Sequence, residues 1–305
     1  MRRFIPLLVL LLCLAVCPAV AENATVFSSQ QLGDMTGIAS DTDLFPVPED
    51  VFLPEGAEII QTENSYKSQN ISIEISSMRY ENSDVYIADI YVRSIANFQR
   101  AYAGGKWKKT TDKVKDMAVE NNAVLAMTGD SGQVIIKGWC IGNGITWRST
   151  TNMKRDIAIL YKNGELKTYP GRVDYEALEP FMDDIWHCFL FGPVLLDAEG
   201  KAMTKFNSDV NPQNPRSAIG YYEPGHYCFV QVDGRKTKSA LEAKKTNKGI
   251  TLKALSQLME DLGCVSAYNL DGGQSSMMWF GGDLVSTPYR GGRRIGDIVL
   301  IKELE

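Results

Sequence analysis

The chain has 305 residues, of which 44% are hydrophobic and 23% are charged, a composition typical of a globular protein with a sizeable core. This length allows one large domain or two small ones. The 32 Lys and Arg residues are outnumbered by 37 Asp and Glu residues, which gives a formal net charge of −5. That charge argues against a nucleic-acid-binding protein, which usually carries a basic surface.

The N-terminus has the pattern of a targeting segment. Arg2 and Arg3 precede an apolar run over residues 4–16, and Ala19-Val20-Ala21 offers a small-residue cleavage site. The pattern predicts a signal peptide over residues 1–21, with an uncleaved anchor as the alternative. No later stretch is long and apolar enough to span a membrane, so no span is expected after the signal is removed.

Residues 22–62 are polar, contain three prolines and show little periodicity, which predicts a spacer that joins the folded part near its end. From residue 63 onward strand patterns dominate. Ile71, Ile73 and Ile75 alternate with polar residues, whereas residues 251–262 have the apolar stripe of a helix that Thr251 caps and Gly263 ends. We therefore expect a single main α+β domain over residues 63–305, with a mixed, mostly antiparallel sheet and a few packed helices.

Six cysteines are present, and two of them, Cys13 and Cys17, would leave with the signal peptide. Export permits disulfides, and four cysteines allow three pairings. Three of the remaining four sit among apolar residues, as free core cysteines do. Free thiols are therefore favoured, and one disulfide remains the alternative, for Cys140, Cys188, Cys228 and Cys264.

The most informative stretch lies near the C-terminus. An apolar run over residues 265–270 stops at Asp271-Gly272-Gly273, and a second apolar run follows over residues 277–280. The glycines allow a sharp turn, and its N–H groups, with Ser275 and Ser276, could form a concavity for an anion. The plainer interpretation is a β-hairpin with Asp-Gly as its turn.

Two further aspartates, Asp130 and Asp233, also follow an apolar run and precede a glycine-containing turn. If the strands share a sheet with aligned ends, these carboxylates and Asp271 meet at one rim, where sites often form. Arg216 stands alone at the start of a strand, a position that an ordinary surface arginine could also occupy. The basic loop over residues 235–248 is either solvated or attracts an anionic substrate.

These residues together resemble the phosphodiester glycosidase family. The resemblance rests on Asn269-Leu270-Asp271-Gly272-Gly273 with Ser275-Ser276, on residues 214–220, on Val232-Asp233-Gly234-Arg235, on residues 191–195 and on Gly129-Asp130. It covers residues 123–301, and several linked motifs in order are more specific than one glycine-rich turn. That family includes the lysosomal enzyme that uncovers mannose 6-phosphate by removing N-acetylglucosamine, and many exported bacterial proteins.

The resemblance implies an exported bacterial hydrolase, secreted or associated with the cell envelope, that cleaves a sugar 1-phosphodiester on a glycan or polymer. It implies that Arg216 and the glycine turn hold the phosphate. Asp130, Asp233 and Asp271 are then candidates for water activation, nucleophilic attack or sugar binding. Candidate substrate-binding residues are Gly129, Asn269, Gly272, Gly273, Ser275, Ser276 and Arg235. Because carboxylates suit hard cations, a divalent cation such as calcium is a further candidate, while the metal ligands and the oligomeric state stay open.

Two departures from the family pattern support an alternative. Gln274 stands where the family usually has a third glycine, and Thr128-Gly129-Asp130-Ser131-Gly132 lacks the usual Asn before Gly-Asp and the aromatic pair after it. A catalytically inactive binder of phosphorylated glycans with the same fold is therefore the second hypothesis. A purely structural envelope protein is the third.

Overall fold

The sheet that carries most of the predicted motifs has seven strands, and all of its strand pairs are antiparallel. The computed structural model describes residues 44–105, 107, 110–130, 135, 137–151, 154–171 and 173–304, so the predicted signal peptide lies outside the described residues. In spatial order the strands are β1 (Ile60–Gln61), β2 (Ser65–Lys67), β3 (Ile71–Tyr80), β4 (Ser83–Val92), β13 (His226–Val232), β12 (Arg216–Glu223) and β16 (Ser266–Asn269).

The longest hairpin of this sheet shows how local sequence sets the register. Along β3, Ile71, Ile73 and Ile75 are buried between less buried polar residues, as their alternation predicts. The turn to β4 consists of Glu81 and Asn82, both with positive φ, which is the geometry of a tight two-residue connection. Every core-facing residue of β3 therefore pairs with a fixed partner on β4.

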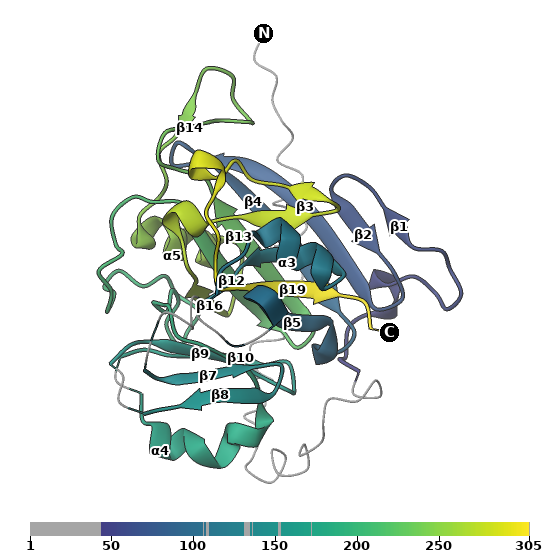
Figure 1. The fold of residues 1–305 in the computed structure, drawn as a ribbon, viewed down its shortest axis with the longest axis vertical. Helices are drawn as coiled ribbons and strands as arrows, with labels where there is room; N and C mark the ends of the chain where they lie inside the picture. Colours follow the sequence, from purple (N-terminus) through teal and green to yellow (C-terminus); the bar gives the residue numbers. More distant parts are fainter. Residues whose placement is uncertain are drawn as a thin grey trace. The chain divides into compact units, whose positions relative to one another are not determined.

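Strand β12 lies between β13 and β16, and its register positions the site. Arg216 pairs with Val232, and Ala218 pairs with Asn269. Because both pairings are antiparallel, the start of β12 lies beside the ends of β13 and β16. The chain segments that follow Val232 and Asn269 therefore leave the sheet next to Arg216. In Figure 1 these three strands run side by side.

A second sheet has five strands, again with antiparallel pairs only. Helix α3 (Val114–Glu120) packs on it through Val114, Met117 and Ala118. The strands in spatial order are β18 (Asp283–Leu284), β17 (Met278–Phe280), β6 (Ala123–Thr128), β19 (Asp297–Lys302) and β5 (Phe98–Tyr102).

The third sheet is formed by the middle of the chain and is also antiparallel. Its strands are β10 (Leu166–Tyr169), β9 (Ile157–Tyr161), β11 (Ile185–Phe189), β7 (Trp139–Gly142) and β8 (Ile145–Ser149). Helix α4 (Tyr175–Leu178) and the 3-10 segment η4 (Glu179–Asp184) follow β10. Tyr175 of α4 contacts the indole of Trp139, and Figure 1 shows α4 beside these strands.

The remaining elements include α5 (Leu252–Asp261), which matches the predicted helix closely. Thr251 caps it by accepting a hydrogen bond from Ala254 N, and its apolar stripe packs on the buried residues of β12 and β13. The others are the ribbon β14 (Thr237–Lys238) and β15 (Thr246–Asn247), and the 3-10 segments η1 (Glu49–Val51), η2 (Ile95–Asn97), η3 (Ala103–Gly105), η5 (Gly273–Ser275) and η6 (Tyr289–Gly291).

The stretch around Asp271 is not a hairpin. Strand β16 pairs with β12 in the seven-stranded sheet, whereas β17 pairs with β6 and β18 in the second sheet. The residues between Asn269 and Met278 therefore cross from one sheet to the other. Thr128, the last residue of β6, fixes this crossing because its hydroxyl donates to Ser275 O and accepts from Met277 N at 3.0 Å.

The predicted α+β class with mostly antiparallel strands is confirmed, and the described residues belong to one compact unit over residues 37–305. The domain boundaries at residues 21 and 62 stay predictions, although Phe52, inside the predicted spacer, is buried. All four described cysteines are free and buried, with Cys228 Sγ and Cys264 Sγ 3.7 Å apart. Among the described residues no helix is long and apolar enough to cross a membrane.

The crossing yields a stability prediction. Replacing Thr128 by Val removes the hydroxyl and leaves Ser275 O and Met277 N without that partner in a buried place, which costs about 1–3 kcal/mol. Urea unfolding should show a lower midpoint for Thr128→Val than for Thr128→Ser, which keeps the hydroxyl. Equal midpoints for the two variants would show that the hydroxyl does not hold the crossing.

Candidate active site

A cavity of about 280 Å³ opens where the start of β12 meets the crossing between the two sheets. Arg216, Arg235 and Asp271, which the sequence predicts as site residues, all line it, as do Gly272 and Gly273. Arg293 lines it as well and was not predicted. Three guanidinium groups therefore face one carboxylate, and we call this cavity the central pocket.

Arg216 is the most unusual of the three. Only 2% of its surface is exposed, and its Nε and Nη2 atoms donate to the backbone carbonyls of Ile250, Asn211 and Pro212. Within the part of the chain that the structure describes, no carboxylate forms an ion pair with it. Burial lowers the pKa of Arg216 to about 10, so the group is still charged at neutral pH. A buried cation that lines a cavity without a counter-ion favours an anion in that cavity.

The other two arginines reach the central pocket from loops. Arg235 follows β13 with φ at +54°, donates from Nε to Asn214 Oδ1 at 3.2 Å and lies over the Tyr289 ring. Arg293 precedes β19, and its Nη2 lies 3.0 Å from Asp271 Oδ2. Both side chains are more exposed than Arg216, so they can adjust to a ligand while Arg216 stays fixed.

Asp271 is the acid of the central pocket. It directly follows the buried Leu270 at the end of β16, and its N–H donates to Gly129 O at 3.2 Å. Its side chain is 8% exposed and forms the ion pair with Arg293. The backbone therefore holds this carboxylate in place at the edge of the cavity.

Fewer residues of the glycine turn line the site than the sequence predicts. Gly273 has φ at +65°, so its backbone favours glycine, and a Cβ there would displace the guanidinium of Arg235. Gln274 lines the central pocket without a positive φ and donates to Gly292 O, so the missing third glycine causes no backbone strain. Ser275 reaches the site only through its hydroxyl, which accepts from Arg293 Nε. Ser276 is buried away from the cavity and bonds Ser217 and Gln231.

Asp130 lies beneath the cavity wall and does not line it. Its carboxylate is fully buried, accepts from the N–H groups of Leu190 and Phe191 at 2.7–2.8 Å and lies 3.5 Å from Arg100 Nη2. Arg100 also pairs with Asp297 at 2.7 Å, so one buried cation serves two carboxylates. Burial, with the charge of Asp297, raises the pKa of Asp130 to about 7. Its position indicates that it holds Phe191, which does line the pocket.

Gly129 and Asn269 support the same region from inside. A Cβ on Gly129 would lie 2.7 Å from Asp297 O, so only glycine allows this approach. Asn269 is buried and donates from Nδ2 to Gly192 O at 2.7 Å, which positions the turn after Phe191. Neither residue lines the central pocket.

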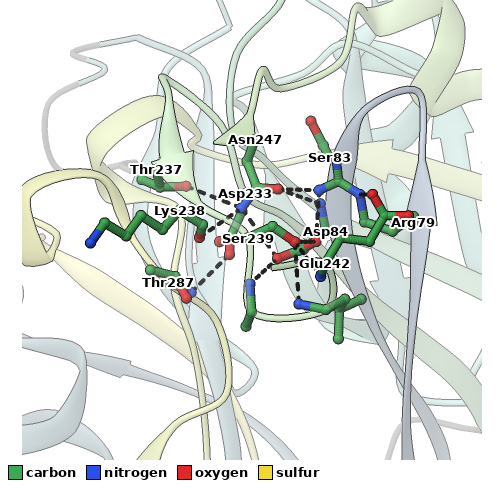
Figure 2. Close-up of polar contacts among 12 residues, drawn as sticks. Arg79, Ser83, Asp84, Asp233, Thr237, Lys238, Ser239, Glu242, Asn247 and Thr287 are labelled. Carbon is green, nitrogen blue, oxygen red and sulfur yellow. Dashed lines mark hydrogen bonds and ion pairs between the residues drawn. The ribbon is translucent and has the colours of Figure 1, made fainter. Parts of the chain in front are cut away.

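Asp233 is likewise buried, at the end of β13, and Figure 2 shows it beside Asp84. Its Oδ2 accepts from Thr287 N at 2.9 Å, whereas Oδ1 has no hydrogen-bond partner among the described residues. Burial raises the pKa of Asp233 to about 7, and the charge of Asp84 adds to this effect. Asp233 therefore anchors the loop between β18 and η6 and does not face the cavity.

Asp84 holds the basic loop over residues 235–248. Arg79 and Ser239 donate to its Oδ1, each at 2.7 Å, and Ala240 N donates to its Oδ2 at 2.7 Å. Burial opposes ionisation, but these hydrogen bonds keep the pKa of Asp84 below its ordinary value. The five lysines of the basic loop over residues 235–248 are exposed and do not line the central pocket. Only Arg235 of that loop does.

No site role was predicted from the sequence for Arg293, for the buried Arg100–Asp297 pair, or for Asn214, which lies in the motif over residues 214–220. Arg293 lies in an irregular loop with no periodic pattern, and only the sequence Gly291-Gly292-Arg293-Arg294 offered a signal. His187 is buried with its Nε2 3.2 Å from Phe98 O, and burial lowers its pKa to about 3. It is a neutral core residue. Among the described residues no group of three or more His, Cys, Asp or Glu side chains could hold a metal ion.

A family model described as phosphodiester glycosidase matches residues 114–302, more than half of the chain. The chain belongs to the phosphodiester glycosidase family. All lining residues of the central pocket lie within the matched range.

The chain is also similar to several individual proteins. The SPβ prophage-derived uncharacterized protein YomE of Bacillus subtilis is 28% identical over 176 residues, which are 54% of this chain and 25% of that protein. This chain thus matches about a quarter of that relative's length. The catalytic domain of zebrafish N-acetylglucosamine-1-phosphodiester α-N-acetylglucosaminidase, auto-inhibited by its pro-peptide, has a TM-score of 0.59 at 19% identity, over 77% of this chain and 83% of that one. A hypothetical protein from Synechocystis has a TM-score of 0.50 at 14% identity, over 81% of this chain and 64% of that one. At these identities the two structures show the shared fold.

The buried Asp233 yields a pH prediction. Its pKa is about 7 in the folded protein and near 3.8 when the chain is unfolded, so the folded state holds the extra proton between those values. The free energy of unfolding therefore falls as the pH rises from about 4 to about 7, by at most about 4 kcal/mol from this group. Asp233→Asn keeps an acceptor for Thr287 N and should show a flatter profile in urea unfolding. The exposed Asp50→Asn should match the wild type, and a wild-type profile for Asp233→Asn would contradict the burial argument.

Proposed function

We propose that the protein is an exported hydrolase that cleaves a sugar 1-phosphodiester in the central pocket. The observation that carries this proposal is Arg216, a buried guanidinium that lines a cavity and has no carboxylate partner among the described residues. A phosphodiester supplies the negative charge that this position lacks. The family assignment supports the same substrate class.

Three arginines suit a phosphate better than lysines would. A guanidinium is planar and can donate two parallel hydrogen bonds to phosphate oxygens. In Arg216 the Nε and Nη2 atoms already donate to backbone carbonyls, so Nη1 is the atom left for the ligand. Arg216 is fixed by backbone carbonyls, while Arg235 and Arg293 reach the pocket from two different loops. Together they would neutralise the charge that grows on the phosphate as its bond to the sugar breaks.

Asp271 is the proposed reactive carboxylate. Hydrolysis breaks the bond between the anomeric carbon and a phosphate oxygen. Water supplies the hydroxyl on the sugar, and its other proton goes to the phosphomonoester or to solvent. The transition state has positive charge on the anomeric carbon, which a neighbouring carboxylate stabilises or attacks. A phosphate already leaves easily, so one acid in the pocket suffices and a second carboxylate that protonates the leaving group is not needed.

The other predicted residues are proposed to position this machinery. Asp130 and Asn269 hold the segment with Phe191 and Gly192, and Asp233 holds the loop that leads to Arg293. This assignment narrows the three candidate acids to Asp271 for contact with substrate. Export remains part of the proposal because it rests on the predicted signal peptide over residues 1–21.

The activity prediction uses a simple sugar 1-phosphodiester, N-acetylglucosamine 1-(methyl phosphate). Wild-type protein should release free sugar, and Asp271→Asn and Arg216→Gln should each lower kcat/KM by about 10²–10³-fold, the effect of removing one stabilising group. Lys238→Gln, an exposed change on the basic loop, should keep the wild-type rate.

The same assay separates the alternative. A binder of phosphorylated glycans without turnover would bind the substrate in calorimetry and release no sugar over a long incubation. Equal turnover by wild type, Asp271→Asn and Arg216→Gln would contradict the proposed site.

A further inference from the structure

The central pocket is the middle one of three cavities that share walls. A cavity of about 290 Å³, which we call the Pro193 cavity, shares Phe191 and Val210 with it. A cavity of about 740 Å³, which we call the Leu284 cavity, shares Arg293 with it. The two outer cavities therefore adjoin the central pocket at different lining residues and share none with each other.

Basic residues continue into both flanks. Lys154 and Arg155 line the Pro193 cavity, and Lys113, Lys115 and Arg294 line the Leu284 cavity. Over the three cavities eight Lys and Arg residues face four Asp residues, although acids outnumber bases in the whole chain. We call the three cavities together the basic track. Bases outnumber acids along this track, whereas acids outnumber bases in the whole chain.

Several of the acids on the track are already engaged. Asp156 is buried, and its carboxylate accepts from Gly171 N at 2.7 Å and Val194 N at 3.0 Å, so it serves the fold. Asp283 lies 3.5 Å from Lys115 in a pair that is largely exposed and therefore weak.

Asp112, beside the track, pairs with Arg294 at 2.7 Å. Lys113, Lys154 and Arg155 form no ion pair with a carboxylate among the described residues. Positive charge is therefore available on both flanks.

The sizes of the cavities limit the ligands that can bind in them. A cavity of about 280 Å³ is at the lower end for a small-molecule site and holds about one sugar with its phosphate. A substrate that ended at the reactive bond would use the central pocket and one flank. Two basic cavities that adjoin the central pocket at different residues fit a chain that passes through the site and carries a negative charge at each repeat.

We propose that the three cavities bind consecutive units of a glycan chain whose sugars are joined through phosphodiester groups, and that the enzyme cuts this chain internally. The inference rests on the proposed function, because the bond that breaks is the same one in the central pocket. Each cut adds one water molecule and gives one fragment with a free reducing sugar and one with a terminal phosphomonoester.

The test compares two substrates with the same reactive bond: N-acetylglucosamine 1-(methyl phosphate) and a synthetic hexamer of N-acetylglucosamine units joined 1→6 by phosphodiesters. Two flank variants are used, Lys113→Gln with Lys115→Gln, and Lys154→Gln with Arg155→Gln. The matched control is Lys238→Gln with Lys245→Gln, which removes two exposed charges that line none of the three cavities.

Each flank variant should raise KM for the hexamer at least about five-fold and leave kcat/KM for the small substrate within about two-fold of wild type. The control should change neither value. Added salt should raise KM for the hexamer more than for the small substrate, because it screens the flank charges. Sizing of early products should show fragments of two to four units.

Release of single units alone from the hexamer, or equal effects of the flank variants on both substrates, would overturn the inference while the proposed function stands. Absence of turnover on both substrates would instead overturn the proposed function and the internal cut with it. A single-stranded DNA of equal charge that competes as well as the hexamer in calorimetry would overturn the assignment to a glycan chain.

Discussion

The hydrogen-bond register of β12 is the constraint on which the site depends. With Arg216 opposite Val232 and Ala218 opposite Asn269, the start of one strand and the ends of its two neighbours meet at one rim. The segments that carry Arg235 and Asp271 therefore leave the sheet beside Arg216. A shift by one residue would turn Arg216 to the other face of the sheet and leave the cavity without its fixed cation.

Buried charges support this rim from two sides. Arg100 joins Asp297 on β19 to Asp130 after β6, and Asp130 in turn holds the N–H groups of Leu190 and Phe191. On the other side Asp84 and Asp233 hold the loops that lead to Arg235 and Arg293. Such groups are costly to bury, so they are kept where they fix a loop in one position. The site therefore combines a rigid Arg216 with Arg235 and Arg293, whose loops are held by hydrogen bonds to buried carboxylates.

The sequence predicted the strand ends and the linked motifs because both are local patterns of apolar runs, glycines and acids. It could not tell which way each acid points. Asp130 and Asp271 both end a strand, but Asp130 turns inward to N–H groups about 60 residues away, and no local pattern encodes those partners. The same holds for the crossing after Asp271, which resembles a hairpin locally and is redirected by pairing of β17 with the distant β6. Arg293 was missed because its loop has no periodic pattern of apolar residues.

The most direct test of the account is a crystal structure of the protein soaked with inorganic phosphate and, separately, with N-acetylglucosamine 1-phosphate. The account predicts phosphate density in hydrogen-bond contact with Arg216 and with at least one of Arg235 and Arg293, and the sugar ring beside Asp271. Phosphate bound elsewhere on the molecule, with only water next to Arg216, would contradict it.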